Sequence, residues 1–262
     1  MSKRNSQEAK RAARERLRIE REKQAKKEKI RRQVIVAGSV VAILGIAGGI
    51  GFAVANMEGD SSKSWSAAAE QKLVKPANAT GENGTTVVLG DKDAKKTIDV
   101  YEDMRCPACA NFEQVLGERL KKGADEGKYK LQFHFGGIID GNFGGDGSKN
   151  ATSALGAALN VSTEAFSEYH SLLYTAEYHP AENQDKFADN DYLLEVAGKV
   201  DALKGNEEFK TAVEKGTYDK WALEMIDGFN KSDVKGTPTV RIDGKDVETT
   251  QIPSELDKLG VK

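Results

Sequence analysis

The segment from residue 97 to residue 112 reads TIDVYEDMRCPACANF and contains the two cysteines of the 262-residue chain, Cys106 and Cys109. Its first part, Thr97–Glu102, is a β-branched run typical of a strand, and the cysteines follow at the start of a helical stretch. A thiol at a helix N-terminus lies near unpaired amide groups and the positive end of the helix dipole, which lowers its pKa. Pro107 falls in the first turn, where proline removes no helix hydrogen bond. The segment therefore predicts a strand, a reactive thiolate and a helix in immediate succession.

A Cys-x-x-Cys pair fits three kinds of site. A structural disulfide is disfavoured, because closing so small a loop adds only about 2 kcal/mol to the stability of the fold in the chain-entropy model. Zinc needs four ligands, and the sequence has no second Cys-x-x-Cys; its three histidines lie in distant segments, where we expect structural roles (His134, His170 and His179). Redox exchange fits best: Cys106 attacks as the thiolate, and Cys109, one turn later, resolves the mixed disulfide. We therefore predict a redox-active Cys106–Cys109 disulfide, with no metal and no other cofactor.

Strand and helix patterns on both sides of this segment predict an α/β fold. Helical patterning runs to about Lys122 after the cysteines and returns over about residues 148–232. Asp243-Gly244 between two short strand-like runs is a strong hairpin signal. The other predicted elements are strands at Thr85–Leu89, Tyr129–Phe135, Thr239–Ile242 and Lys245–Val247 and a closing helix at Pro253–Leu259. The order is β-β-α-β, a long helical block, then β-β-α.

The chain resembles the DsbA-like branch of the thioredoxin superfamily. Tyr101–Cys109 (YEDMRCPAC) is similar to the family's aromatic-x-Asp-x-x-Cys-Pro-x-Cys motif, and Phe112 follows where the family often has an aromatic residue. Phe166–Tyr174 resembles a recurring segment of the family's inserted helical domain, and Gly236–Thr239 (GTPT) resembles its cis-proline loop. The likeness covers roughly residues 85–262. It implies a thioredoxin fold with a helical insertion at about 148–232 and a thiol–disulfide oxidoreductase activity.

The resemblance also implies roles for individual residues. The peptide bond between Thr237 and Pro238 is expected to be cis, in a loop that faces the cysteines and binds an extended substrate segment by backbone hydrogen bonds. Pro107 and Ala108, between the cysteines, are expected to support the redox motif. From its position beside the first cysteine, Arg105 is expected to add a favourable charge to the thiolate.

Two departures from the family pattern bear on the chemistry. Ala108 stands where strongly oxidising members often carry histidine, so one donor to the thiolate is missing. The buried acid of thioredoxins, six residues before the first cysteine, would fall at Val100 and is absent. Glu102 or Asp103 is expected to replace it as the proton acceptor for Cys109. The alternative for each residue is that its carboxylate only lies at the end of the strand and takes no part in proton transfer.

The first 84 residues differ from the rest in composition. Residues 1–33 contain 14 Lys/Arg against 5 Asp/Glu, a net charge of +9 in a chain whose total is −2. Residues 34–55 carry no charge, and at about 1.5 Å per residue this helix would cross a hydrocarbon core of roughly 30 Å. Because positive flanks stay inside, we expect a single-pass transmembrane signal anchor in the cell membrane, with a cytoplasmic basic arm. We further expect a flexible linker at 56–84 and an extracytoplasmic domain. Cleavage after Ala55 is the alternative.

The charged arm also bears on partners. We expect its positive charges to be attracted to anionic lipid at the membrane surface, and no nucleic-acid partner is expected. An extracytoplasmic Cys106–Cys109 disulfide is expected to oxidise the thiols of exported proteins, because disulfides persist outside the cytoplasm. A membrane redox partner would then reoxidise the two cysteines. A membrane-tethered disulfide reductase or isomerase remains an alternative, as does a non-enzymatic metal-binding or redox-sensing module. The mean hydropathy of −0.55 excludes a multi-span membrane protein.

Overall fold

The computed structural model of the chain describes residues 65–81 and 84–262. The predicted basic arm (1–33), the predicted membrane span (34–55) and the first part of the predicted linker lie outside these residues. Within the described residues, no helix combines the length and the apolar character needed to cross a membrane.

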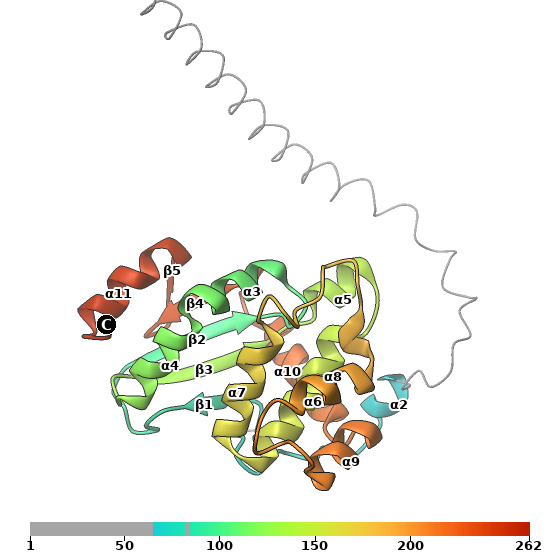
Figure 1. Cartoon of the computed structure of the whole chain (residues 1–262). Helices are drawn as coiled ribbons and strands as arrows, with labels where there is room; N and C mark the ends of the chain where they lie inside the picture. The colour runs from blue at the N-terminus through green and yellow to red at the C-terminus, as the bar shows by residue number, and fades with distance from the viewer. Residues whose placement is uncertain (1–64, 82–83) are drawn as a thin grey trace, which may run out of the picture. The chain divides into compact units, whose positions relative to one another are not determined.

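A five-stranded mixed sheet lies at the centre of the domain, with strand order β1-β3-β2-β4-β5 (Figure 1). β2 and β3 run parallel, whereas the other neighbouring strands pair antiparallel. All five strands predicted from the sequence are present, with small shifts at their ends. They are β1 (Val87–Leu89), β2 (Thr97–Glu102), β3 (Lys130–Phe135), β4 (Thr239–Ile242) and β5 (Lys245–Val247). The redox motif follows β2, a strand with a hydrogen-bonded neighbour on each side.

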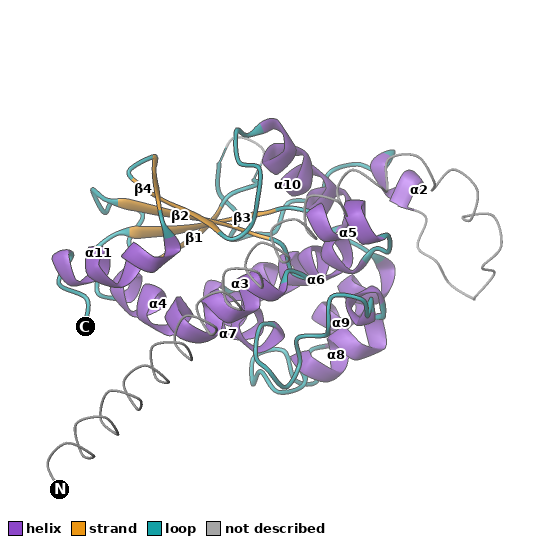
Figure 2. Ribbon diagram, turned by 90° about the horizontal axis from the view of Figure 1, so that it is seen from above, coloured by secondary structure: helices purple, strands orange, loops and turns teal. Residues whose placement is uncertain are grey.

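Helices cover both faces of this sheet. Figure 2 shows the sheet nearly edge-on, with α10 on one face and α3, α4, α6 and α7 on the other. The predicted helix after the cysteines is present as α3 (Pro107–Phe112), a π-helical turn η1 (Glu113–Gly117) and α4 (Glu118–Asp125), which follow one another without a break. The closing helix α11 (Ile252–Lys258) follows the short η3 turn (Thr249–Gln251).

Between β3 and β4 the chain is helical, as predicted for about residues 148–232. The elements are α5 (Ile138–Phe143), α6 (Gly147–Val161), α7 (Thr163–Leu173), η2 (Lys186–Ala188), α8 (Asn190–Ala197), α9 (Glu207–Lys215) and α10 (Asp219–Lys231). Almost every residue of α6 is buried. This fits a sequence of small and apolar residues that lets neighbouring helices approach α6 from several sides.

The folded domain begins earlier than its predicted boundary at residue 85. A short helix, α2 (Trp65–Ala69), lies against α10, and the chain after it is held by side-chain hydrogen bonds. Asn160 Oδ1 accepts from the amide of Ala77, and Asn78 Nδ2 donates to the carbonyl of Leu159. The predicted linker at 56–84 is therefore wrong for residues 65–81. Its Ser/Ala/Asn-rich composition carries no apolar pattern, and polar contacts with the end of α6 order it instead.

The β4–β5 hairpin has the predicted turn. Asp243 and Gly244 have φ angles of 50° and 77°, as a two-residue turn with left-handed central residues requires. The Asp243 carboxylate accepts from the amide of Thr97 at 3.0 Å and pairs with Lys96 at 2.7 Å. The hairpin is therefore tied to the start of β2, the strand that leads into the redox motif.

Candidate active site

The turn between β2 and α3 positions both cysteines. Cys106 is the N-cap residue of α3 and Pro107 is the first residue of that helix, as the sequence predicts. The amide of Cys106 donates to the carbonyl of Asp103 at 2.9 Å, which closes the turn after β2. Both cysteines are free thiols; Cys109 is fully buried and Cys106 is 6% exposed. The structure therefore presents the reduced dithiol with Cys106 as the more accessible sulfur.

The cis-proline loop meets Cys106. The peptide bond between Thr237 and Pro238 is cis, which confirms the prediction, and Cys106 Sγ lies 3.6 Å from the carbonyl oxygen of Thr237. The pKa of Cys106 is lowered to about 6, first by a hydrogen bond from Cys109 and then by the side chain of Thr237 and the amides of Cys109 and Ala108, against the opposing effect of burial. A lowered pKa was expected, and Ala108 contributes a backbone donor although its side chain has none.

Cys109 has the opposite environment. Burial raises its pKa well above the usual value, and the hydrogen bond to Cys106 and the charge of Glu102 raise it further. The two thiols therefore differ strongly: Cys106 is a thiolate at neutral pH and Cys109 holds its proton. This is the asymmetry that an attacking and a resolving thiol require.

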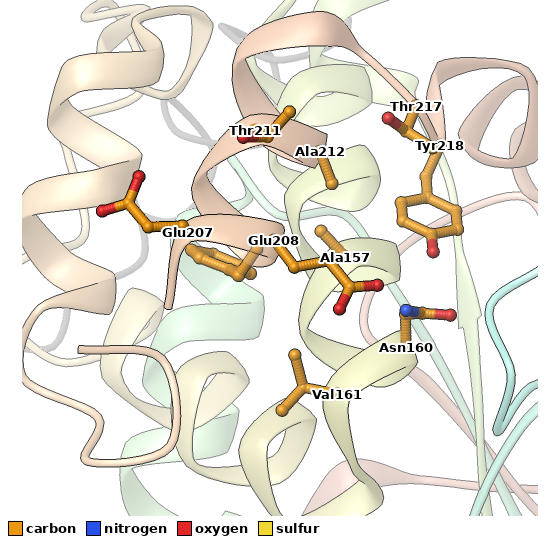
Figure 3. Close-up of a pocket in the computed structure, with 10 residues that line it drawn as sticks. Ala157, Asn160, Val161, Glu207, Glu208, Thr211, Ala212, Thr217 and Tyr218 are labelled. Carbon is orange, nitrogen blue, oxygen red and sulfur yellow. The ribbon is translucent and has the colours of Figure 1, made fainter. Parts of the chain in front are cut away.

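A groove adjoins the redox motif. It has a volume of about 340 Å³. Its walls include Ala108, Pro238 and further residues of α3 and η1. Val115, which contributes to its lining, is 69% exposed. A second pocket, of about 430 Å³, lies between α6 and α9 (Figure 3) and includes none of the predicted site residues.

The two carboxylates predicted as proton acceptors have different surroundings. Asp103 is occupied by donors: its carboxylate accepts from the amides of Arg105 and Ile139, both at 2.9 Å, and from Ser148 Oγ at 2.6 Å. It fixes the turn before Cys106 and is a structural acceptor. Glu102 Oε2 lies 2.9 Å from His170 Nε2, and the Glu102 side chain also shares a hydrogen bond with the buried side chain of Glu113. The structure therefore favours Glu102 over Asp103 for proton transfer.

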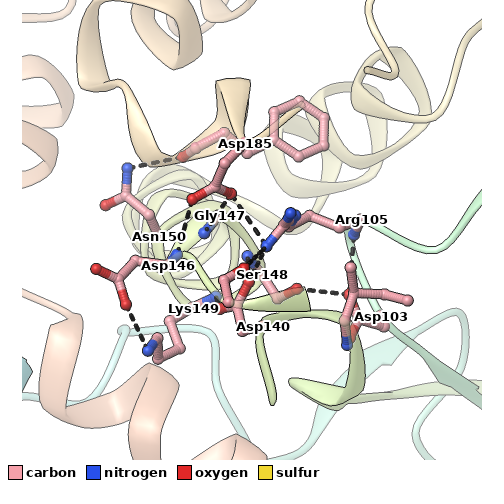
Figure 4. Close-up of polar contacts among 12 residues, drawn as sticks. Asp103, Arg105, Asp140, Asp146, Gly147, Ser148, Lys149, Asn150 and Asp185 are labelled. Atoms are coloured by element: carbon pink, nitrogen blue, oxygen red, sulfur yellow. Dashed lines mark hydrogen bonds and ion pairs between the residues drawn. The ribbon is translucent and has the colours of Figure 1, made fainter. Parts of the chain in front are cut away.

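The side chain of Arg105 does not serve the thiolate, contrary to our expectation. Its guanidinium lies in a buried polar network (Figure 4), 2.8 Å from Asp140 Oδ1, 3.2 Å from Asp185 Oδ1 and 2.8 Å from the carbonyl of Gly144. The Asp185 carboxylate also accepts from the amides that begin α6. Arg105 therefore joins the turn before Cys106 to the helical insertion. Its partners are 35 and more residues away in the chain, so the sequence alone did not reveal them.

Two of the histidines have the structural roles expected for them. His134 Nε2 lies 2.9 Å from Asp99 Oδ1, and its ring stacks on Tyr101 at a centroid distance of 4.4 Å. His179 Nε2 lies 3.2 Å from the carbonyl of Met104. Both contacts hold strand or loop segments together.

The sequence analysis missed Glu113, which is buried and lies close to Glu102 and His170. Side-chain atoms of these three residues all lie within 4.8 Å of one another. One signal could have identified Glu113: it follows Cys109 by four residues, the spacing that places two side chains on one helix face.

Comparisons with known proteins agree with this geometry. The sequence model of the family described as Thioredoxin matches residues 82–259. Serine/threonine-protein kinase PknE of Mycobacterium tuberculosis is 28% identical over 185 residues, 66% of this chain; the chain spans only 31% of the length of that protein. Disulfide bond formation protein D of Bacillus subtilis is 25% identical over 159 residues, 60% of this chain and 68% of that protein. The crystal structure of oxidised DsbA from M. tuberculosis is similar with a TM-score of 0.57 and 25% identity, over 66% of this chain and 92% of that one.

Proposed function

The chain belongs to the thioredoxin family, and from this premise we propose that it is a DsbA-like thiol–disulfide oxidoreductase that oxidises the thiols of exported proteins. One observation carries the proposal. Cys106, at the N-terminus of α3 and beside the cis-proline loop, has a pKa of about 6. A buried structural thiol would have no reason to ionise at neutral pH, whereas a redox thiol needs to.

The reaction begins from the oxidised form, with a disulfide between Cys106 and Cys109. A substrate thiolate attacks Cys106 Sγ, the Cys106–Cys109 bond breaks, and Cys109 leaves with the electron pair and takes up a proton. A second substrate thiolate then attacks the substrate sulfur of the mixed disulfide. Cys106 leaves as a thiolate, the substrate has gained a disulfide, and the protein has gained two electrons and the proton on Cys109. A leaving thiol departs faster when its pKa is low, so the acidic Cys106 favours this second step.

The substrate segment would bind between the cis-proline loop and the groove. The backbone at Thr237, already in contact with Cys106 Sγ, is available to an extended peptide, and the groove beside Ala108 and Pro238 offers apolar surface for a side chain. A cysteine-containing segment of a partly folded protein has both features. The geometry supports broad recognition of peptides through their backbone.

The direction of electron flow follows from the stability of the thiolate. Stabilising the Cys106 thiolate stabilises the reduced protein, and this makes its disulfide the stronger oxidant. A reductase or isomerase role in a membrane-tethered protein is the second candidate, and the absent histidine at Ala108 is the observation that favours it. A membrane partner that reoxidises Cys106 and Cys109 belongs to the oxidase proposal.

The placement of the domain outside the cytoplasm rests on the sequence of residues 1–55. A net charge of +9 before an uncharged run of 22 residues supports a single-pass anchor with a cytoplasmic arm near anionic lipid. With this topology the domain lies outside the cytoplasm, where it would meet the exported proteins that we propose as substrates.

The test uses the purified protein and a reduced peptide with two cysteines. The oxidised protein should convert the peptide to its disulfide form in stoichiometric amount. Cys106→Ser should abolish this, and Cys109→Ser, offered a peptide with a mixed-disulfide leaving group, should accumulate a covalent complex through Cys106. Activity retained by Cys106→Ser would contradict the proposal. Faster insulin reduction than peptide oxidation in a glutathione buffer would favour the reductase.

A further inference from the structure

The pocket between α6 and α9 is separate from the redox motif. Its volume of about 430 Å³ falls in the range of about 300–1,000 Å³ that small-molecule sites occupy. Residues from the C-terminal part of α6 line it, whereas the first turn of α6 contacts the redox turn, where Ser148 Oγ donates to Asp103 Oδ1. At about 1.5 Å per residue, the helix puts about 15 Å between the two places. The pocket is therefore a second candidate site.

Small side chains leave this space open. Ala157 on α6 and Ala212 on α9 both line the pocket, and neither side chain is long enough to fill the gap between the two helices. Val161 and the ring of Phe209 add further apolar surface. Walls of this kind suit the apolar body of a ligand, while a few polar groups fix its orientation.

The Tyr218 side chain contributes one of these polar groups. Tyr218 is 5% exposed, and its hydroxyl points toward Asn160 at the pocket (Figure 3). A buried tyrosine hydroxyl usually has a hydrogen-bond partner, and those of Tyr129, Tyr169 and Tyr174 each donate to a backbone carbonyl. The Tyr218 hydroxyl has no such partner among the described residues. A ligand in the pocket would supply one.

The charge at the pocket is negative. The residues that line it include two carboxylates, Glu207 and Glu208, and no lysine, arginine or histidine. Glu208 points toward Asn160 and the Tyr218 hydroxyl, whereas Glu207 points away from them (Figure 3). Burial raises the pKa of Tyr218, and the charge of Glu208 raises it further, so these two groups interact. The Asn160 side chain is held in place by the amide of Ala77, which donates to its Oδ1 at 3.0 Å.

The position of Glu208 in its helix does not explain this arrangement. Glu207 and Glu208 both lie in the first turn of α9, where acidic residues favour the helix dipole. The dipole accounts for the two acids but not for the direction of Glu208 or for the unpaired Tyr218 hydroxyl. The nearby lysine of α9 does not neutralise Glu208, because Lys210 pairs with Glu214 at 3.8 Å.

The same groups disfavour a metal ion. Calcium and magnesium take six or more oxygen ligands, whereas one carboxylate faces this pocket and most of its walls are apolar. An organic cation fits better. A primary ammonium has three donors and no acceptor, and the carboxylate of Glu208 and the oxygen of the Tyr218 hydroxyl are both acceptors.

We propose that the pocket between α6 and α9 binds a small organic amine, whose ammonium group donates to the Glu208 carboxylate and to the Tyr218 hydroxyl. The aromatic or aliphatic body of the amine lies between Ala157, Ala212 and the ring of Phe209. This is a binding function in addition to the thiol–disulfide exchange, and neither cysteine takes part in it.

The experiment compares three compounds that share a phenyl ring and differ in their head group. They are 2-phenylethylamine, the neutral 2-phenylethanol and the anionic phenylacetate. Each is titrated into the full chain in a mild detergent, with carbon-13 in the methyl groups of alanine and valine. The signals of Ala157, Val161 and Ala212 report on this pocket, whereas those of Ala108 and Val115 report on the groove beside the redox motif.

The amine should shift the signals of the pocket and leave those of the groove unchanged. One partly exposed ion pair and one hydrogen bond contribute modestly, so the amine should bind about three- to tenfold more tightly than the alcohol. Phenylacetate should bind most weakly, because its charge repels Glu208. The preference for the amine should decrease as salt screens the charges.

Four variants separate the charge from the shape of the pocket. Glu208→Gln should remove the preference for the amine and leave the affinity for the alcohol unchanged. Glu207→Gln is the matched control, since it makes the same change on the neighbouring side chain that points away. Tyr218→Phe keeps the ring and should weaken binding of the amine about threefold. Ala212→Leu fills the space and should weaken binding of all three compounds, with circular dichroism as the check on folding.

Three results would overturn the proposal. An equal loss of amine affinity in Glu207→Gln and Glu208→Gln would mean that the amine responds only to the negative field of this surface. Shifts confined to Ala108 and Val115 would place the compounds in the other groove. Binding of a lysine-containing peptide at the pocket, without binding of the free amine, would replace the small molecule by a polypeptide. Loss of the preference in Glu208→Gln alone supports the amine site.

Discussion

Replacing Cys109 by alanine should raise the pKa of Cys106, whereas replacing it by serine should preserve most of the lowered value. The hydrogen bond from Cys109 is the largest cause of the pKa of about 6 at Cys106. A hydrogen bond to a charged group contributes about 1.5–3 kcal/mol, and 1.36 kcal/mol corresponds to about one pH unit. The alanine variant, which lacks the donor, should therefore have a Cys106 pKa higher by about one to two pH units. The serine hydroxyl retains a donor.

The assay is the ultraviolet absorbance of the thiolate as a function of pH, checked by the pH dependence of alkylation with iodoacetamide. Both variants contain one thiol, so every change in signal belongs to Cys106. Circular dichroism at each pH shows whether the fold is retained. A pKa near 6 in the alanine variant would refute the reasoning, because it would mean that the helix N-terminus and Thr237 stabilise the thiolate without Cys109.

Four further outcomes can be measured. The reduction potential, from a glutathione titration, should lie between the values of thioredoxin and DsbA, about −270 and −120 mV, and Ala108→His should raise it; a value below that of thioredoxin would reverse the proposed direction. The pKa of Cys106 is lower in the folded protein, so the stability that its thiolate adds is fully present above a pH of about 9 and is lost as the pH falls through about 6. The free energies of unfolding of the reduced protein and of Cys106→Ser, measured in urea, should therefore differ increasingly as the pH rises through this window. Arg105→Met leaves Asp140 buried without its cation and should cost about 3–5 kcal/mol of unfolding free energy, with partial recovery on adding Asp140→Asn; a cost below about 1 kcal/mol would fit an exposed pair instead. Protease added to intact spheroplasts should remove the chain after residue 56 and spare the basic arm, and protection of the domain would contradict the proposed topology.

The parts of the fold that the sequence predicted are those encoded by neighbouring residues. The strand before Cys106, the proline that starts α3 and the Asp243-Gly244 turn each depend on contacts within a few positions. The cis bond at Pro238 came from the likeness of a four-residue loop to a known one, and composition would not have indicated it. The same holds for the pairing of that loop with the cysteines, which are about 130 residues away.

The parts that the sequence did not predict depend on distant partners. Arg105 looked like a charge for the thiolate because only its neighbour in the chain was visible, whereas Asp140 and Asp185 bind it in the fold. Residues 65–81 looked like a linker because their order comes from single side chains such as Asn160. Glu113 was not singled out, since no propensity scale distinguishes a π-helical turn from an α-helical one.

That π-helical turn links the chemistry of the site to the number of residues in the helix. A π-helical turn accommodates one residue more than the α-helical path between the same two points. Deleting Val115 would restore a regular helix between α3 and α4 and would move Gly117 from the position where it leaves room for the Glu113 carboxyl group. Relatives in which this helix is one residue shorter should therefore lack the space for a second buried carboxyl group. An insertion or deletion at this point, with no substitution of the cysteines, would be enough to gain or lose that space during evolution.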